Sequence, residues 1–252
     1  MSDSPSWYLD PLVAEQKRAV HQRWLRGAIG SRPPGVVLKT DLFEEAHGRD
    51  RIFNDLFPGN GLAIGMDRNP QTVALADRRN TPAFVSMVCD VRGLALCPES
   101  VDVVVSMSTL DHFDARNDIA TSLDEIARVL RQGGILLITL DNPWNPSYHV
   151  VRWLSRRGWA PYELGETLSL PTLKRMLIDR GLRVQTTAYL IHNPRGFSTL
   201  WFLALRRILG SFASVPIRML LAVFAFLGKL PLRPVTGCFL AVGAVKDAPG
   251  PG

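Results

Sequence analysis

Cysteine is scarce in this chain. Cys89, Cys97 and Cys238 are the three cysteines among 252 residues, and their spacing matches no metal-ligand pattern. A disulfide framework is excluded by this count, and we expect an intracellular, reduced protein without a metal site. The first residues also lack the apolar core of a signal peptide, so we expect a cytoplasmic location.

The sequence has no unbroken apolar run long enough to span a membrane. Its longest unbroken tract, Met219 to Leu227, is bounded by Arg218 and Lys229. A spanning helix needs about 20 predominantly apolar residues. We therefore expect a buried or interfacial helix, within a helical hairpin over 197–232 that exposes part of its apolar surface.

Acidic residues are rare in the second half. Residues 1–149 hold 15 Lys/Arg and 19 Asp/Glu, a balance of −4, whereas residues 150–252 hold 14 and 4, a balance of +10. A basic and apolar half suits an anionic membrane surface, with the protein peripheral to it, or a lipid-like ligand. Solvated arginines are the equal alternative. We expect no nucleic-acid partner, because no basic face carries interleaved aromatic residues.

The stretch Leu123 to Pro143 is the most informative one present. Apolar residues at helical spacing lead to Gly133-Gly134, and an apolar run, Ile135 to Leu140, follows. The pattern predicts a helix that ends at the glycines and then a buried parallel strand. Further strands are predicted over 36–38, 62–67, 83–88, 101–107, 182–191 and 236–246. Helices are predicted over 1–30, 43–56, 70–80 and 170–181.

This helix, Gly-Gly and strand unit resembles the cofactor half of class I S-adenosylmethionine-dependent methyltransferases, of the methyltransferase type 11 kind. The resemblance implies an α/β, Rossmann-like fold with a mostly parallel seven-stranded sheet, helices on both faces and an antiparallel last strand. It divides the chain into an N-terminal helical segment (1–34), the methyltransferase-like domain (35–192 and 236–246), a hydrophobic helical insert (197–232) and a disordered tail (247–252). Segments 143–168 and 197–232 would cover the substrate side.

Two acidic residues follow successive predicted strands. Asp67 ends LAIGMD, and Asp90 ends VSMVCD. In the family that these motifs resemble, the first acid binds the ribose hydroxyls. The second acid lies near the adenine amino group, with the backbone of the next residue, here Val91, beside the ring. The alternatives are a helix cap for Asp67 and a turn residue for Asp90, and a cap role is compatible with ribose binding.

The first strand departs from the family pattern of an acid followed by Gly-x-Gly. The chain has VVLKTDLFEEAHG, with no glycine before Gly48. Asp41 is the candidate acid for the cationic methionine end of the cofactor, and Glu44 and Glu45 follow it. The alternative for these carboxylates is an ordinary helix N-terminus, where acids are favoured by the dipole.

The segment SMSTLDHF ends the fourth predicted strand, at the sheet edge where ligands bind in open α/β folds. Ser106 is a cofactor candidate there. Asp111 and His112 are an adjacent acid and imidazole, and His112 is the candidate general base. A packed or capping histidine is the alternative.

Three more residues are candidates for the acceptor. Asn142 ends the fifth strand, and His192 and Arg195 precede the insert in YLIHNPRG. The latter two suit a polar or anionic head group, and a plain turn at Asn193-Pro194 is the alternative.

The sequence therefore predicts transfer of a methyl group from S-adenosylmethionine to a small acceptor that is hydrophobic or lipid-linked. The alternative is a non-catalytic methyltransferase-like module that contacts membrane or protein, which the absent glycines favour. An NAD-dependent reductase is disfavoured because no glycine-rich turn follows the first strand.

Overall fold

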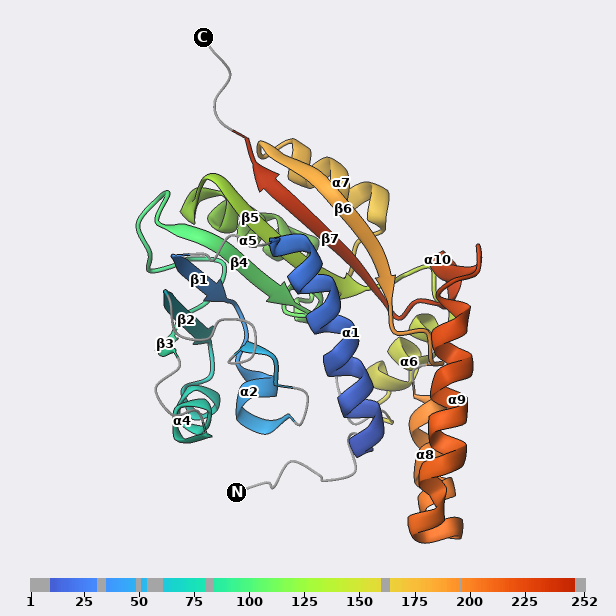
Figure 1. The fold of residues 1–252 in the computed structure, drawn as a ribbon. Coiled ribbons are helices and arrows are strands. Elements are labelled where there is room, and N and C mark those ends of the chain that lie inside the picture. The colour runs from blue at the N-terminus through green and yellow to red at the C-terminus, as the bar shows by residue number, and fades with distance from the viewer. Residues whose placement is uncertain are drawn as a thin grey trace.

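The computed structural model describes residues 10–30, 35–48, 51–53, 61–79, 84–159, 164–194 and 196–247. Its centre is a seven-stranded sheet in the order β3-β2-β1-β4-β5-β7-β6 (Figure 1). Strands β1 to β5 are parallel where they pair, and β7 is antiparallel to both of its neighbours, which confirms the predicted mixed sheet. The strands are β1 (Val36–Lys39), β2 (Leu62–Asp67), β3 (Val85–Val88), β4 (Val101–Met107), β5 (Leu130–Asp141), β6 (Leu182–Leu190) and β7 (Phe239–Lys246).

Helices cover both faces of this sheet, as the sequence predicts. The helical elements are α1 (Pro11–Ile29), α2 (Phe43–His47), α4 (Pro70–Arg79), η1 (Leu110–His112), α5 (Arg116–Val129), α6 (Pro146–Arg156), α7 (Leu170–Ile178), α8 (Phe197–Leu209), η2 (Gly210–Ala213), α9 (Ser214–Leu227) and α10 (Arg233–Thr236). Helix α1 lies on one face, and α5 and α7 lie on the other (Figure 1).

The central strand β4 shows why the sequence alternates apolar strands with helices. Val104 packs with Leu123 of α5 in one core, while its neighbour Val105 packs with Leu25 of α1 in the other. All seven residues of β4 are buried. A strand covered on both faces has no solvent side, so it needs no polar alternation.

The predicted role of Gly133-Gly134 is wrong. Helix α5 ends at Val129, and the chain is extended from Leu130 onward. Val101 pairs with Leu130 and Val103 with Ile135, so five steps along β5 face two along β4. Gly133, at φ 73°, therefore serves a bulge in the strand rather than a helix cap.

The continuous helix predicted over 43–56 is also wrong. Helix α2 stops at His47, and Gly48 follows it in an extended conformation. Residues 54–56 lie outside the described part of the chain. So do residues 1–9 of the predicted N-terminal segment, Arg195, and the predicted tail beyond Asp247.

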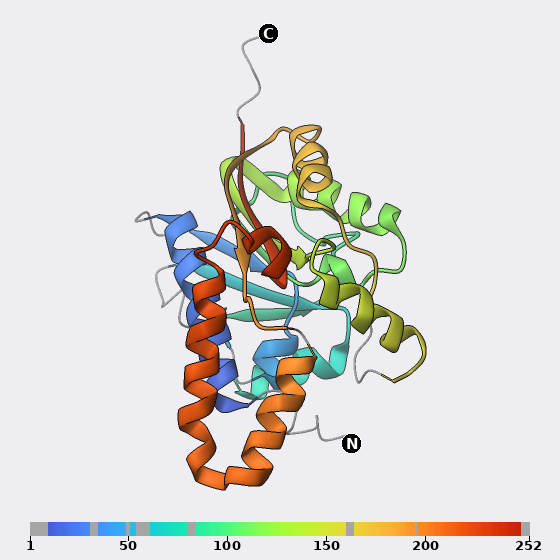
Figure 2. The ribbon, with the colours of Figure 1, turned by 90° about the vertical axis from the view of Figure 1, so that its right-hand side faces the viewer.

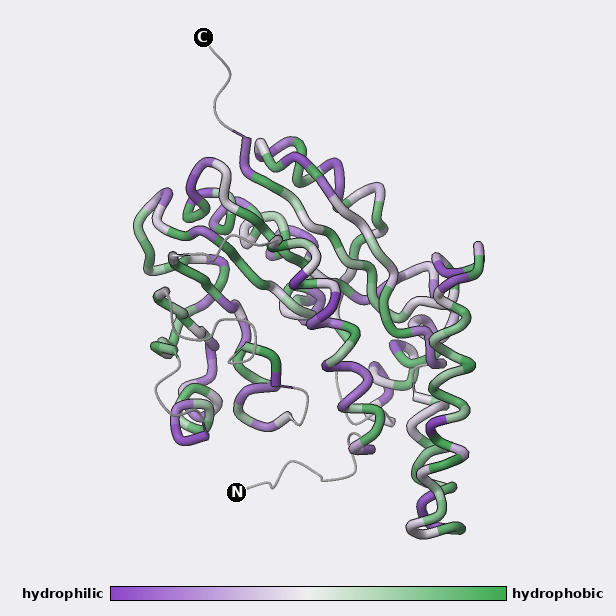
Figure 3. Tube along the Cα trace, in the orientation of Figure 1, coloured by the Kyte–Doolittle hydropathy of each residue, from purple (hydrophilic) through white to green (hydrophobic). Residues whose placement is uncertain are grey.

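The hydrophobic insert is a helical hairpin, as predicted. Helices α8 and α9 are antiparallel arms that meet at η2 (Figure 2), where Gly210 has a φ of 54° and breaks the helix. Between the arms, Phe202 and Ile217 form a small core that also takes in Leu12 and Val13 of α1. The hairpin is therefore fixed to the sheet domain through α1, and its hydropathy is high along both arms (Figure 3).

Candidate functional site

The carboxyl ends of β1 and β4 meet where the strand order changes direction, the place where open α/β sheets bind ligands. The Oγ1 atoms of Thr40 and Thr109 are 3.0 Å apart there, and the Thr40 N–H donates to the Val105 carbonyl. Ser108 has a φ of 48°, and its N–H donates to the carbonyl and the Oγ1 of Thr139. A non-glycine residue with positive φ stores strain, which concentrates at functional sites.

A buried lysine ends β1. Lys39 is 1% exposed, and its Nζ donates to the Asp41 carbonyl. It also lies 3.7 Å from Glu44 Oε2 and 3.8 Å from Glu45 Oε1. Glu45, at 0% exposure, accepts from the backbone N–H groups of Ile52–Phe53. Lys39 therefore pairs with two carboxylates at this strand end, those of Glu44 and Glu45, and the carboxylate of Asp41 adds further negative charge nearby.

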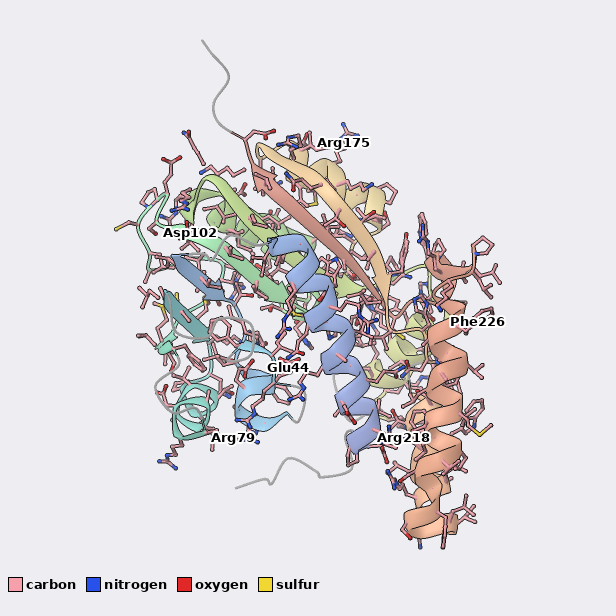
Figure 4. The ribbon with its side chains drawn as sticks, viewed as in Figure 1. Glu44, Arg79, Asp102, Arg175, Arg218 and Phe226 are labelled. Atoms are coloured by element: carbon pink, nitrogen blue, oxygen red, sulfur yellow. The ribbon has the colours of Figure 1, made fainter. Side chains whose placement is uncertain are left out.

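The pKa values of two of these carboxylates move in opposite directions. Burial and the charge of Glu44 raise the pKa of Asp41 to about 7, against the opposing effect of Lys39. Burial also acts to raise the pKa of Glu44, but Lys39 and Lys17 outweigh it and lower that pKa to about 2. Lys17 is on α1, 3.7 Å from Glu44 Oε1, and Glu44 lies on the side of α2 toward α1 (Figure 4). Asp41 is thus the carboxylate whose ionised form is less well compensated by nearby cations than that of Glu44.

The loop after β1 is held by side chains in place of glycines. The Asp41 Oδ1 accepts from the N–H of Phe43 at 2.8 Å, and the Asp67 Oδ2 accepts from that of Leu42 at 3.3 Å. The Leu42 side chain is buried beneath the loop, in space that Gly65 of β2 provides. A Cβ on Gly65 would lie 2.6 Å from Leu42 Cδ2. Leu42 therefore does not project from the carboxyl edge. Two backbone N–H groups of the loop, those of Leu42 and Phe43, already bond to Asp67 and Asp41.

Asp67 combines a structural task with a position at the end of β2. Its Oδ1 accepts from the N–H of Asn69 at 2.8 Å, and the Asn69 side chain in turn accepts from the N–H of Gln71 at the start of α4. The cap of α4 is therefore Asn69, and Asp67 stabilises the turn before it, so the alternative role of Asp67 as the helix cap is wrong. A carboxylate has about four acceptor positions, so the two backbone bonds leave capacity for ribose hydroxyls.

Asp90 is paired with a residue that sequence reasoning missed. Arg92 donates to it from Nε at 3.0 Å and from Nη2 at 2.7 Å, and these bonds lower the pKa of Asp90. Arg92 also lies 3.2 Å from Asp118 and 5.1 Å from the ring centre of Phe113. The Arg92 N–H bonds back to Asp90 as well, so the predicted turn is present, and the neighbouring Val91 is buried.

The candidates after β4 lie in different surroundings. Ser106 is fully buried, and its Oγ has no hydrogen-bond partner among the described residues. Asp111 is also buried, and its Oδ2 accepts from the Asp141 N–H at 2.6 Å. His112 is exposed, so Asp111 anchors the end of β5 while His112 remains open to an acceptor.

Asn142 works with a neighbour that the sequence analysis did not single out, Asn145. The Asn142 side chain donates to the carbonyls of Pro234 and Gly237, at 2.7 and 2.8 Å. Asn145 donates to those of Thr236 and Gly237, at 3.0 and 3.1 Å. Both amides therefore bind the backbone around α10, which favours a positioning role for Asn142.

His192 lies at the base of the hairpin. Its Nδ1 is 2.9 Å from Thr236 Oγ1, its Nε2 is 3.1 Å from the Tyr189 carbonyl, and burial lowers its pKa. A Cβ on Gly228, just after α9, would lie 2.7 Å from this ring. His192 therefore packs where α9 returns to the sheet, and Arg195 lies outside the described residues.

Sequence reasoning missed Lys39, the Thr40–Thr109 pair, Ser108 and Arg92. A signal existed for Lys39, since it is the single charged residue at the end of the apolar run VVLK. Arg92 stands two residues after Asp90 in the same turn. Threonines and a strained serine carry no such signal, because their roles arise from the meeting of strands far apart in the sequence.

Comparison with known proteins points to the same kind of protein as the sequence motifs do. The family described as "Methyltransferase domain" matches residues 46–138, which run from α2 into β5. Residues 46–138 of this chain are therefore similar to the methyltransferase domain family. The fold of the chain as a whole is similar to those of solved methyltransferase structures.

One relative is the tRNA (carboxymethyluridine(34)-5-O)-methyltransferase ALKBH8 of Mus musculus. It is 31% identical over 96 residues, which are 34% of this chain and 14% of that protein. The chain therefore matches about a seventh of its length.

Two solved structures show how far the fold extends. A chain from the complex of the Haloferax volcanii Trm112 methyltransferase activator with a methyltransferase is 19% identical, with a TM-score of 0.59, over 93% of this chain and 94% of that one. The geranyl diphosphate C-methyltransferase of Streptomyces coelicolor A3(2) is 16% identical, with a TM-score of 0.59, over 90% and 79%. At these identities the likeness concerns the fold.

Proposed function

We propose that this chain binds S-adenosylmethionine at the carboxyl edge of its sheet and transfers the methyl group to an acceptor with a large apolar part. The observation that carries the proposal is a row of acids. Asp41, Asp67 and Asp90 follow β1, β2 and β3, which are neighbours in a sheet with the strand order of methyltransferases.

The residues of this edge suit the parts of the cofactor. Asp67 has free acceptor capacity for ribose hydroxyls, and the Asp90–Val91 turn is in place for the adenine. Asp41 and Glu44 suit the cationic methionine end, because burial and the charge of Glu44 raise the pKa of Asp41, and a bound cation stabilises its ionised form. The buried Ser106 Oγ is a further donor and acceptor without a described partner.

When bound, S-adenosylmethionine would supply a methyl group on a sulfonium. A lone pair of the acceptor would bond to the methyl carbon as the carbon–sulfur bond breaks, with S-adenosylhomocysteine as the leaving group. The protein's task is then chiefly to align the acceptor. Where the acceptor is a hydroxyl or an amine, it must also release a proton. His112 is exposed beyond β4 and suits that role.

The apolar α8–α9 hairpin adjoins this edge and supports an apolar acceptor. Strands β5 and β6 are both antiparallel to β7, so they end at the same side of the sheet, and the apolar hairpin begins directly after β6. The fold-level neighbour from Streptomyces coelicolor acts on geranyl diphosphate, an apolar chain with an anionic head. The basic balance beyond residue 149 suits such a head group.

Calorimetry with S-adenosylhomocysteine tests the cofactor half. We expect binding to the wild type, weakened by roughly 1–3 kcal/mol in Asp67→Ala, the loss typical of hydrogen bonds to a charged group. Asp179→Ala is the control, because Asp179 is an exposed carboxylate at the end of α7. Undetectable binding at millimolar ligand to a folded wild type contradicts the proposal.

The second candidate is a non-catalytic methyltransferase-like module. The loop after β1 favours it, since the N–H groups of Leu42 and Phe43 already bond to Asp67 and Asp41. The same titration separates the two. A module that has lost its cofactor shows no heat with either the wild type or Asp67→Ala.

A further inference from the structure

The outer side of the hairpin carries an exposed apolar surface. We call it the hairpin face and define it by residues that are each 52–81% exposed: Leu200, Trp201, Phe212, Val215, Met219 and Phe226. Phe226 lies on the side of α9 away from α1 (Figure 4). Bulky apolar side chains gathered on one surface of a folded domain mark a contact with a partner.

Helix α9 is apolar on both of its sides. Ile217, Leu221 and Phe224 face the core between the arms, and Val215, Met219 and Phe226 recur on the opposite side. A surface helix of a soluble protein normally carries polar residues there. The outer side of α9 is therefore built for an apolar environment.

Basic residues rim this surface without acidic ones. Positions 180–246 contain no Asp or Glu. Arg207, Arg218, Lys229 and Arg233 are exposed on or beside the hairpin. An apolar face with a basic rim is complementary to the head groups and outer acyl region of an anionic membrane.

A second copy of the chain fits the hairpin face less well. A twofold contact brings a surface against itself. Arg207 and Arg218 would then face the hairpin of the other copy, which has no acid in 180–246 to pair with them. A membrane with anionic lipid places the opposite charge against the same rim.

Two tryptophans, one on the neighbouring helix α6 and one just after it, favour a lipid interface. Trp153 and Trp159 are 48% and 68% exposed, and the Arg157 guanidinium lies over both rings, 4.0 and 5.7 Å from their centres. Helix α6 adjoins the start of α8, because a Cβ on Gly196 would lie 3.3 Å from the Val151 side chain. Tryptophan and arginine are typical of the boundary between head groups and acyl chains.

The dimensions favour a helix pair that lies in one leaflet. Residues 197–227 are long and apolar enough to cross a membrane by length and composition, with 22% of the most apolar window buried. The structure divides them into arms of 13 and 14 residues. Each arm is only about 20 Å long, against a hydrocarbon core of about 30 Å.

We propose that the hairpin face docks on the surface of a membrane that contains anionic lipid. The end at Phe212 enters the head-group region, and the carboxyl edge of the sheet is held near the bilayer. The hairpin begins at that edge, so an acceptor dissolved in the membrane has a short path to it. Docking is measured without cofactor, so a negative result for docking and a negative result for methyl transfer can be told apart.

Cosedimentation of the full chain with vesicles tests the proposal. We expect binding to vesicles of phosphatidylcholine mixed with phosphatidylglycerol, weaker binding to phosphatidylcholine alone, and release as salt rises. The double variant Phe212→Ser/Phe226→Ser should lower partitioning at least about tenfold, because two large apolar side chains no longer enter the bilayer. Ile178→Ser is the control, since Ile178 is 62% exposed on α7, far from the hairpin.

A second pair of substitutions tests the contribution of the basic residues to membrane binding. Arg207→Gln/Arg218→Gln should reduce binding to the anionic vesicles and leave the weak binding to neutral ones unchanged. Arg175→Gln is the control, because Arg175 is exposed on α7 at the opposite end of the molecule (Figure 4). Circular dichroism must show a native fold in each variant. If Phe212→Ser/Phe226→Ser is misfolded, Leu200→Ser on the other arm replaces it.

Two outcomes overturn the proposal. One is equal recovery, near zero, with both kinds of vesicle at low salt. The other is a dimer by light scattering that the Phe212→Ser/Phe226→Ser change converts to a monomer without altering vesicle recovery, since the face would then bind a second copy.

Discussion

Folded proteins usually bury apolar side chains and expose charged ones. The carboxyl edge of the sheet departs from this rule by burying charge, and the α8–α9 hairpin departs from it by exposing apolar side chains. The edge buries charge, with Lys39 and Glu45 at 1% and 0% exposure, whereas the hairpin exposes Phe212 at 81%. Buried charge and exposed aromatic surface both cost stability. A fold keeps such arrangements where a ligand or a partner uses them, which is why both regions are functional candidates.

The difference also shows what each region can recognise. The edge has a surplus of carboxylates around Lys39, so it suits a cation. The hairpin has arginines and no acid, so it suits an anionic and apolar surface. The charge balance of −4 and +10 between the two halves of the sequence follows the same division, because the edge around Lys39 belongs to the acidic half and the hairpin to the basic half. The predictions below separate them, from the largest effect to the smallest.

The largest effect is expected at Lys39. Lys39→Met leaves the fully buried Glu45 without its cation, and we expect a loss of about 3–5 kcal/mol in the free energy of unfolding, measured in urea. Adding Glu45→Gln should restore part of it, because the amide oxygen still accepts from the two backbone N–H groups. Lys174→Met on α7 is the control. A loss below about 1 kcal/mol in Lys39→Met contradicts the buried-charge description.

Asp102 tests the opposite edge of the sheet. It is 6% exposed, its Oδ2 accepts from the Val36 N–H at 2.6 Å, and Arg131 pairs with its Oδ1 (Figure 4). Asp102→Ala should cost about 1–3 kcal/mol, since it leaves that N–H without its acceptor. Affinity for S-adenosylhomocysteine, by calorimetry, should stay unchanged. Weakened cofactor binding in a folded variant would show that the two edges are not independent.

The sequence predicts the strands of this fold better than their ends. The apolar runs of β4 and β5 identify buried strands because no solvent side interrupts them. It fails at Gly133-Gly134, since a glycine pair serves a bulge as well as a helix cap, and pairing with β4 decides between them. The hairpin is predicted because its apolar residues outnumber what one helix face can bury and because Arg206, Arg207, Arg218 and Lys229 punctuate the segment.

In the candidate site, too, the sequence predicts local patterns but not tertiary contacts. Asp67 and Asp90 are predicted because an acid at the end of an apolar strand is a local pattern. The pairing of Asp90 with Arg92 and the tie from Asn142 to α10 depend on tertiary contacts. Burial of Lys39 is not predictable from VVLKTD, since lysine is normally exposed and three carboxylates must assemble around it.

A smaller, pH-dependent effect is expected at Asp41. Its pKa is about 7 in the folded protein and near 3.8 in an unfolded chain, so the folded state holds the proton more tightly. The stability from this group is present below pH 4 and is lost as the pH rises through 7. Asp41→Asn should therefore melt above the wild type at pH 8 and level with it at pH 4.

The same variant tests the cofactor contact. Ionised Asp41 is the form that suits a cation, so affinity for S-adenosylhomocysteine should rise with pH through about 7 in the wild type and lose that rise in Asp41→Asn. Calorimetry in buffers of different ionisation enthalpy should show proton release on binding. Unchanged affinity together with an unchanged melting temperature discards the contact, because asparagine caps a helix nearly as well.

The smallest change in stability is expected at the hairpin tip, where two phenylalanines of one hairpin give opposite results. Phe212 is 81% exposed on η2, and Phe202 is 2% exposed between the arms. Phe212→Ala should change the free energy of unfolding by less than about 0.5 kcal/mol, as is usual for surface substitutions. Phe202→Ala should cost about 3–5 kcal/mol, because it leaves a cavity. In vesicle cosedimentation Phe212→Ala should lower binding more than Phe202→Ala, since only Phe212 faces outward. A large loss of stability in Phe212→Ala would place that side chain in a core instead of at a surface.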